Sequence, residues 1–206
     1  MIIKIFETGI LQVNTYLLID EETKDAVIID LGGNLDTLMS EVESNGATLK
    51  YVLNTHGHFD HIMGDVELNQ KGIPIYMHAG DKELVENIEE GLRRWGIADS
   101  HPPVKIDGFI DENSNLKIGN TPIKVIFTPG HTQGGVSYLV GDNLFSGDTL
   151  FQGSIGRTDL EGGDYATLIK SIKEKLLPLP DDTKVFPGHG PTTTIGYEKN
   201  YNSFLR

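Results

Sequence analysis

Short apolar runs recur along the chain and are separated by polar turns. The first three runs are MIIKIF (residues 1–6), TYLLID (15–20) and AVIIDLGG (26–33). Runs rich in Ile, Val and Leu between turn residues are typical of β-strands. Residues 34–46 then carry apolar residues at helical spacing, with Asn34 as a candidate N-cap and a closing Gly46. This pattern predicts an α-helix.

The alternation of strands and helices continues to the C-terminus. Further strands are predicted in residues 49–55, 73–78, 121–130, 135–148 (two strands joined by a Gly-Asp-Asn turn) and 183–190. Helices are predicted in residues 61–72, 81–96 and 164–180, with a final helical turn or two in 195–206. Residues 97–120 are rich in Pro, Gly and Asn and predict a loop with short strands. Because no linker or repeat interrupts this order, we expect one layered α/β domain over residues 1–206.

Four of the predicted strands run into a turn that contains Gly or Pro and carries a potential metal ligand. The ligand-type residues at these strand ends are His56, His131, Asp148 and His189. Strand ends on one side of a sheet are where residues distant in sequence converge into a site. The sequence therefore predicts that these four side chains lie close together.

The segment LNTHGHFDHIMGD, residues 53–65, adds to this set. It holds His56, His58, Asp60 and His61 within six positions, although the whole chain has only 7 histidines. Gly57 is expected to let the backbone turn so that both flanking histidines face one volume. Imidazole and carboxylate together suit zinc, iron or manganese, and a polar loop with coincidental histidines is the alternative.

Two histidines lie outside this pattern. His78 and His101 follow no such strand-end turn, so we expect ordinary surface or loop roles for both. With them set aside, seven residues remain as candidate metal ligands: His56, His58, Asp60, His61, His131, Asp148 and His189.

Composition narrows the chemistry further. The chain has no cysteine, so disulfides, thiolate ligands and a cysteine nucleophile are excluded and any metal site must use His, Asp and Glu. The net charge of −13 and the lack of a basic stripe disfavour nucleic acid as a partner. No apolar stretch is long enough to span a membrane, and no signal sequence is evident at the N-terminus. We expect a cytoplasmic protein.

The motifs THGHFDH, PGHTQGG, FSGDTLF and PGHG resemble those of the metallo-β-lactamase superfamily, in the family's order over nearly the whole chain. From Ser154 onward the sequence resembles the short glyoxalase II-like (hydroxyacylglutathione hydrolase-like) enzymes, as do VNTYLL and VIIDLGG near the start. The resemblance implies a four-layer αβ/βα sandwich with a dinuclear metal site at one edge of the paired sheets.

The resemblance also implies roles for the seven candidates. His56, His58 and His131 would hold one divalent ion, Asp60, His61 and His189 would hold a second, and Asp148 would bridge them. Zinc is the expected metal, with iron and manganese as alternatives. The implied reaction is hydrolysis of a hydroxyacyl thioester such as S-lactoylglutathione by a hydroxide shared between the metals, with Asp60 and Asp148 as catalytic residues.

The resemblance is incomplete beyond His189, where only 17 residues follow. Full-length glyoxalase II enzymes carry a C-terminal helical domain that contacts glutathione, so the thiol carrier stays open here. Four residues near the site are candidates for shaping substrate binding: Phe59, Ile62, Phe151 and Arg157. A structural salt bridge is at least as good an interpretation of Arg157, so we leave Arg157 out of the predicted site residues. Trp95 is expected to serve helix packing.

The same fold allows other functions. The nearest alternative is a mononuclear iron persulfide dioxygenase, which carries the same seven residues and the GRTD element. A secreted β-lactamase would need a signal peptide, a nuclease would need basic surfaces, and flavin-coupled diiron proteins carry a flavin domain. A binding protein without catalysis is disfavoured because clustering seven metal-type residues is costly without a metal.

Overall fold

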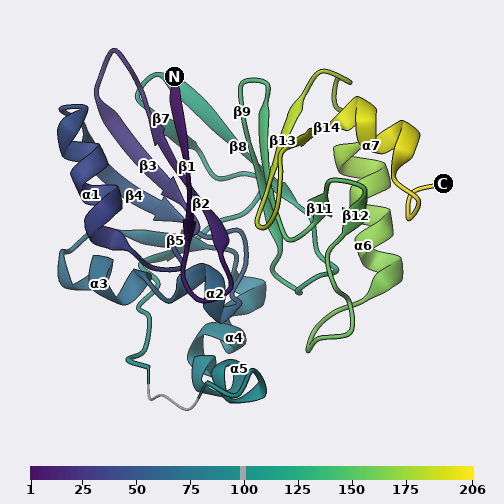
Figure 1. The fold of residues 1–206 in the computed structure, drawn as a ribbon, viewed down its shortest axis with the longest axis horizontal. Coiled ribbons are helices and arrows are strands. Elements are labelled where there is room, and N and C mark those ends of the chain that lie inside the picture. Colours follow the sequence, from purple (N-terminus) through teal and green to yellow (C-terminus); the bar gives the residue numbers. More distant parts are fainter. Residues whose placement is uncertain (98–100) are drawn as a thin grey trace.

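Two six-stranded sheets face each other in the computed structural model, which describes residues 1–97 and 101–206 (Figure 1). The first sheet has the order β1 (Ile2–Thr8), β2 (Val13–Ile19), β3 (Asp25–Ile29), β4 (Thr48–Leu53), β5 (Ile75–Met77), β6 (Gly108–Phe109). Its strands β1 to β3 pair antiparallel, and β3 to β6 pair parallel. The parallel half requires crossover connections, which the helices between these strands provide.

The second sheet has the order β14 (Thr193–Thr194), β13 (Lys184–Pro187), β10 (Asn143–Gly147), β9 (Val136–Val140), β8 (Thr121–Phe127), β7 (Leu116–Ile118). Its pairs are antiparallel except β10 with β13, which run parallel. A small hairpin of β11 (Leu150–Phe151) and β12 (Ser154–Ile155) follows β10. The strands predicted from the apolar runs are thus present, and they divide between the two sheets in chain order.

Helices cover the outer faces of both sheets. The elements on the first half are α1 (Leu35–Ser44), α2 (Phe59–Ile62), α3 (Asp65–Gln70), the 3₁₀ turn η1 (Ala79–Asp81), α4 (Lys82–Glu86) and α5 (Ile88–Arg94). Those on the second half are α6 (Tyr165–Ser171), its continuation as the π-helix η2 (Ile172–Leu176), and α7 (Ile195–Tyr201). In Figure 1, α1 and α3 lie outside the first sheet, and α6 and α7 lie outside the second.

Continuous apolar runs form strands here because both faces of each sheet are buried. In β2, Tyr16 and Leu18 face the space between the sheets, where they pack with Tyr138 and Phe145 of the second sheet. The alternate residues Leu17 and Ile19 face outward and pack under α1. A third cluster joins the second sheet to α6, η2 and α7, and a fourth joins α2 to α4 and α5. These layers form the predicted four-layer αβ/βα sandwich.

Two predicted helices are interrupted. The helix predicted over 61–72 is two helices, α2 and α3, which break at Gly64. The Gly64 N–H donates to the Leu31 carbonyl at 2.9 Å, and a Cβ on Gly64 would lie 2.5 Å from Leu31 Cγ. The helix predicted over 81–96 also breaks at Asn87, between α4 and α5. The break at Gly64 therefore depends on contact with Leu31.

The predicted cap at Asn34 is only partly correct. Asn34 occupies the N-cap position of α1, but its backbone is left-handed, with φ of 59°, and its side chain makes no capping hydrogen bond. Of the loop predicted over 97–120, residues 98–100 lie outside the described residues, and β6 and β7 are its short strands. Among the described residues, no helix is long and apolar enough to cross a membrane.

Candidate metal centre

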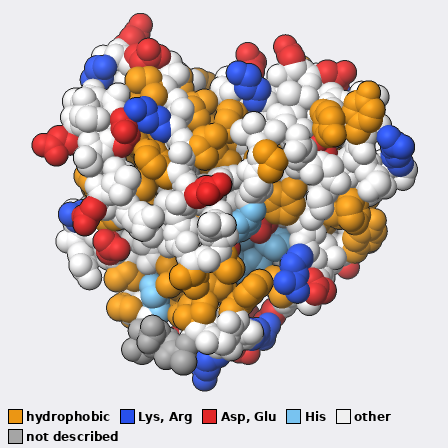
Figure 2. All heavy atoms as spheres, viewed as in Figure 1, with side chains coloured by type: hydrophobic (Ala, Val, Ile, Leu, Met, Phe, Trp, Pro, Cys, Tyr) orange, Lys and Arg blue, Asp and Glu red, His pale blue; other side chains and the backbone are white. Residues whose placement is uncertain are grey.

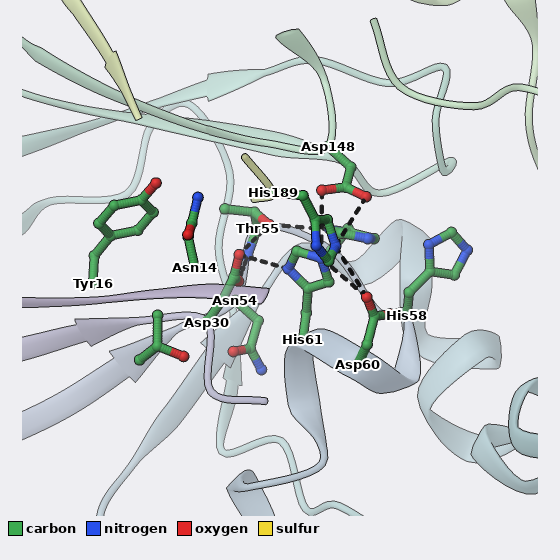
Figure 3. A network of polar contacts seen from close by, with 12 residues as sticks. Asn14, Tyr16, Asp30, Asn54, Thr55, His58, Asp60, His61, Asp148 and His189 are labelled. Atoms are coloured by element: carbon green, nitrogen blue, oxygen red, sulfur yellow. Dashed lines mark hydrogen bonds and ion pairs between the residues drawn. The ribbon is translucent and has the colours of Figure 1, made fainter. Parts of the chain in front are cut away.

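The structure brings all seven candidate ligands together at one edge of the sandwich. Figure 3 labels five of them: His58, Asp60, His61, Asp148 and His189. The first sheet supplies four of them: His56 and His58 from the loop after β4, and Asp60 and His61 from α2. The second sheet supplies three, each from the turn after a strand: His131 after β8, Asp148 after β10 and His189 after β13. The predicted convergence of strand ends therefore occurs.

One group of donors consists of three histidines. His56, His58 and His131 each offer a ring nitrogen within 4.8 Å of the other two. Their ring centroids lie 4.7–4.8 Å apart, and His58 Nδ1 is 2.9 Å from His131 Nε2. Two ring nitrogens at this separation suit a common cation between them.

A second group combines one carboxylate with two histidines. Asp60, His61 and His189 likewise offer donor atoms that all lie within 4.8 Å of one another. His189 Nε2 is 3.2 Å from Asp60 Oδ2, and His61 Nε2 is 3.7 Å from the same oxygen. The ligand sets expected from the resemblance correspond to these two groups.

Asp148 lies between the two groups. Its Oδ1 is 3.4 Å from His61 Nε2, and its Oδ2 is 3.6 Å from His131 Nε2 and 3.8 Å from His189 Nε2. It also forms a third set of donors with His56 and His61, one residue from each group. This placement fits the bridging role expected for Asp148.

The chemistry of the donors fits divalent metal. Among the described residues, His56 Nε2, His61 Nε2 and Asp148 Oδ1 are buried and have no hydrogen-bond partner. Buried polar atoms without partners are costly, and cations bound at the two donor groups would satisfy all three. Neutral imidazoles with carboxylates are ligands of zinc, iron and manganese, so the residues present can hold such an ion.

The protonation of the first group favours metal binding. Burial, reinforced by the neighbouring His61, lowers the pKa of His56 well below its usual range. Burial together with His131 lowers the pKa of His58 to about 3. Both imidazoles are therefore neutral at physiological pH, which is the form that binds metal.

The carboxylates of the site are ionised. Burial alone would raise the pKa of Asp148, but the charges of His61, His131 and His189 outweigh it and lower that pKa. Burial would likewise raise the pKa of Asp60, and His61 and His189 again outweigh it, so this pKa is also lowered. Both acids are thus charged acceptors in the middle of the site.

Asp30 holds the ligand His61 and the residue Thr55 in place by hydrogen bonds. It was not identified from the sequence. Its Oδ2 lies 2.8 Å from His61 Nδ1 and accepts from the Thr55 hydroxyl at 2.8 Å, and its Oδ1 accepts from the Thr55 N–H at 2.7 Å. Asp30 has a left-handed backbone with φ of 55°, an unusual conformation for a residue other than glycine. Its position after β3, in the segment VIIDLGG, is the same strand-end setting that marked the other residues.

The reason predicted for Gly57 is wrong. Gly57 does not have a positive φ. A larger residue is disfavoured there because a Cβ would lie 3.0 Å from Asp81 Cβ.

His78 and His101, the two histidines set aside in the sequence, lie outside all three donor groups, as expected. His78 stacks on Phe127, and its Nδ1 accepts from the Gly80 N–H. His101 lies near the Pro102 and Met63 carbonyls.

A cavity of about 560 Å³ opens onto the site. His58, Asp60, His131, Asp148 and His189 line it, and Figure 2 shows pale blue histidine atoms in a hollow beside hydrophobic side chains. Its apolar wall includes Leu11, Phe59, Leu84, Ile88, Trp95, Phe151 and Leu160. Trp95 is 48% exposed and lines this opening, and its ring also meets Phe59 of α2 at 6.3 Å between centroids.

Of the four residues expected to shape substrate binding, three line the cavity and one does not. Phe59, Phe151 and Arg157 line the cavity, whereas Ile62 is fully buried against other apolar side chains. Arg157 donates to both oxygens of Asp159, at 2.9 and 2.8 Å, and its guanidinium lies 6.0 Å from the Trp95 ring centroid. The salt-bridge interpretation of Arg157 therefore matches the structure.

Comparisons with known proteins agree with this geometry. The family model of the metallo-beta-lactamase superfamily matches residues 8–189. The hydroxyacylglutathione hydrolase GloC of Haemophilus influenzae is 41% identical, over all of this chain and 98% of its own length. The probable metallo-hydrolase YqgX of Bacillus subtilis is also 41% identical, over 96% of this chain and 94% of its own.

Three solved structures share the fold over most of their length. The B3 metallo-beta-lactamase BLEG-1 has a TM-score of 0.88 at 40% identity, covering 99% of both chains. TTHA1623, solved in a di-iron-bound form, has a TM-score of 0.87 at 38% identity, covering 98% of this chain and 100% of its own. ETHE1 from Myxococcus xanthus has a TM-score of 0.82 at 29% identity, covering 98% of this chain and 84% of its own. The resemblance inferred from the motifs is confirmed: this chain belongs to the metallo-β-lactamase superfamily.

Proposed function

We propose that this protein is a dinuclear metallohydrolase that cleaves a thioester of the hydroxyacyl-thiol type. The observation that carries the proposal is the gathering of seven donors into two groups with Asp148 between them. Its similarity to the hydroxyacylglutathione hydrolase GloC supports the substrate class. Its similarity to TTHA1623, which was solved in a di-iron-bound form, supports two metals.

The two groups would each hold one divalent ion. His56, His58 and His131 would bind the first, Asp60, His61 and His189 the second, and Asp148 would contact both. Zinc is the metal we propose, and iron or manganese suits the same donors. When bound, such ions lower the pKa of water towards neutrality and polarise a carbonyl group.

The chain's own residues place the substrate and handle protons. The apolar side chains of the cavity wall would shield the bound substrate from water beside the donors that line the same cavity. Asp60 lines this cavity, with its Oδ2 3.2 Å from His189 Nε2, so it is positioned to take up the proton released from the attacking water. A thiol has a pKa of about 8.5, so the leaving group departs as thiolate without a dedicated acid.

The first test is the metal content of protein purified without added metal or chelator, measured by elemental analysis. About two zinc, iron or manganese ions per chain are expected, together with hydrolysis of S-lactoylglutathione or of another hydroxyacyl thioester. The hydrolysis is measured by the free thiol that it releases.

A different result would assign the alternative function. One iron per chain, with no thioester hydrolysis and with oxygen consumed in the presence of a persulfide, would replace the hydrolase by a mononuclear dioxygenase. Two ions per chain without cleavage of any thioester would retain the dinuclear site and reject the substrate class.

A further inference from the structure

Asp81 is a buried carboxylate near the first donor group that has no part in the proposed function. It ends η1, the turn that follows β5, and it is 1% exposed. Its Oδ2 accepts from the Gly57 N–H at 2.9 Å and from the Thr132 hydroxyl at 2.7 Å. Its Oδ1 accepts from the Gly134 N–H at 2.5 Å. All three donors belong to segments distant from Asp81 in the sequence.

Two of these donors directly adjoin the histidines of the first group. Gly57 lies between His56 and His58, and Thr132 directly follows His131. One carboxylate therefore joins the loop of the first sheet that carries two of the histidines to the loop of the second sheet that carries the third. Asp81 makes these contacts with two backbone N–H groups and a hydroxyl, and it acts on the loops rather than on the imidazoles themselves.

The backbone is built closely around this carboxylate. A Cβ on Gly57 would lie 3.0 Å from Asp81 Cβ, and a Cβ on Gly134 would lie 2.7 Å from Asp81 Cγ. A Cβ on Gly80 would lie 2.8 Å from Gly134 Cα. None of these three glycines has a positive φ, so each is explained by the space it leaves and not by its backbone conformation.

We propose that Asp81 is a positioning residue that sets the spacing of His56, His58 and His131 by holding their two loops together. The inference rests on the proposed function, in which these histidines bind one metal ion. Loss of the carboxylate would leave the Gly57 and Gly134 N–H groups without their acceptor and free the loops to separate. In the second donor group, His61 is held by a different carboxylate, Asp30, which also accepts from Thr55 beside His56. Asp81 is therefore expected to affect one ion and not the other.

The test compares metal affinities of the full-length apoprotein with those of three variants. Asp81→Asn replaces one acceptor oxygen by an amide that opposes an N–H group. Thr132→Val removes a single hydrogen bond with little change of volume. Glu198→Gln is the matched control, since Glu198 is a fully buried carboxylate that accepts from Gly153, Thr193 and Asn202 outside the metal centre.

Each protein is titrated with Zn²⁺ against a chromophoric chelator, and the visible spectrum of the Co²⁺ form is recorded. For Asp81→Asn we expect the dissociation constant of one ion to rise by about 10- to 100-fold, which is the usual effect of removing a group that positions metal ligands. The second ion should bind as in the wild type, and the Co²⁺ spectrum should change. Thr132→Val should show a smaller rise for the same ion, and Glu198→Gln should bind both ions normally.

Several results would overturn the inference. Unchanged affinities in Asp81→Asn would do so, as would an equal loss in Glu198→Gln, which would reduce the effect to general destabilisation. If Asp81→Asn does not fold, Thr132→Val decides alone, and unchanged affinity there rejects the role. A wild-type protein that binds fewer than two ions would instead reject the proposed function, and the role of Asp81 with it.

Discussion

Asp148 has two oxygens that face different donor groups. Oδ1 lies 3.4 Å from His61 Nε2, and Oδ2 lies 3.6 Å from His131 Nε2. Because each proposed ion would lose a ligand, Asp148→Ala should retain less than one ion per chain. Substitution of a residue that only hydrogen-bonds to a metal ligand typically costs up to about 100-fold in activity. Because Asp148 is itself a proposed ligand, the thioester hydrolysis of Asp148→Ala should fall by more than that. Elemental analysis and thiol release measure both effects, and full activity in this variant would reject the dinuclear site.

His101→Ala is the control for that variant. His101 lies outside the donor groups, near the carbonyls of Pro102 and Met63. Metal content and hydrolysis should stay close to those of the wild type. A large loss in this variant would show that His101 had been wrongly excluded from the site.

Asp65 is a fully buried acid whose protonation affects stability. Its Oδ2 accepts from Asn54 Nδ2 at 2.6 Å, while Asp65 Oδ1 and Asn54 Oδ1 find no hydrogen-bond partner in the part of the chain that the structure describes. Burial raises the pKa of Asp65 well above its usual range, so the folded protein keeps a proton that the unfolded chain releases above about pH 4. Stability from this group is therefore complete at low pH and is lost as pH rises towards the raised pKa.

Asp65→Asn should remove this pH dependence, because an amide does not titrate. Between about pH 5.5 and 7.5 the free energy of unfolding of the wild type should fall relative to the variant by up to about 1.4 kcal/mol for each pH unit. Urea unfolding of both metal-free proteins at the two pH values measures the difference. Parallel changes in the two proteins would mean that Asp65 is ionised when folded.

At the level of secondary structure, the sequence predicted most elements but not where helices break. Strands were recognisable because both faces of each sheet are buried, and the ligands at strand ends followed from that pattern. The break at Gly64 depends on contact with Leu31, which is distant in the sequence and leaves no local signal. Asp30 shares the strand-end setting of the ligands, but its role was missed because it is defined by contact with His61 from another element.

The turn before His131 is held against α6, which makes Gly130 sensitive to substitution. Gly130 has φ of +133°, and a Cβ there would lie 2.3 Å from the backbone nitrogen of Leu168. Since backbone atoms give way poorly, Gly130→Ala should destabilise the apoprotein by at least about 2 kcal/mol. Urea unfolding measures this loss.

Gly46→Ala is the matched control. Gly46 also has a positive φ, +61°. Apart from its two chain neighbours, no described residue has an atom within 4 Å of the position that a Cβ would take there, so only the backbone preference is disturbed. That preference costs about 1 kcal/mol. Equal losses in the two variants would show that contact with α6 is unimportant.

At the scale of the whole molecule, the donor groups connect the two halves of the sandwich. The first sheet carries four of the seven candidate ligands and the second carries three. Metal binding should therefore stabilise the folded state and oppose separation of the sheets. At free metal about 1,000-fold above the dissociation constant, one ion contributes about 4 kcal/mol.

Chelation should reverse that stabilisation. We expect the metal-free protein to unfold at lower urea concentration than the reconstituted protein, and added Zn²⁺ should restore the midpoint. Asp148→Ala supplies the control, since metal should shift its midpoint little. An equal midpoint with and without metal in the wild type would mean that the donors do not join the halves.

The paired guanidinium groups of the cavity wall bear on how substrate arrives. Arg94 is bound to Glu90 and Glu161, and Arg157 to Asp159, so these two cavity-lining arginines are already paired with acids of the chain. The protein as a whole carries a formal charge of −13. Long-range attraction therefore contributes little to capture of an anionic thiol carrier, and added salt, which screens such attraction, should not slow its encounter with the enzyme.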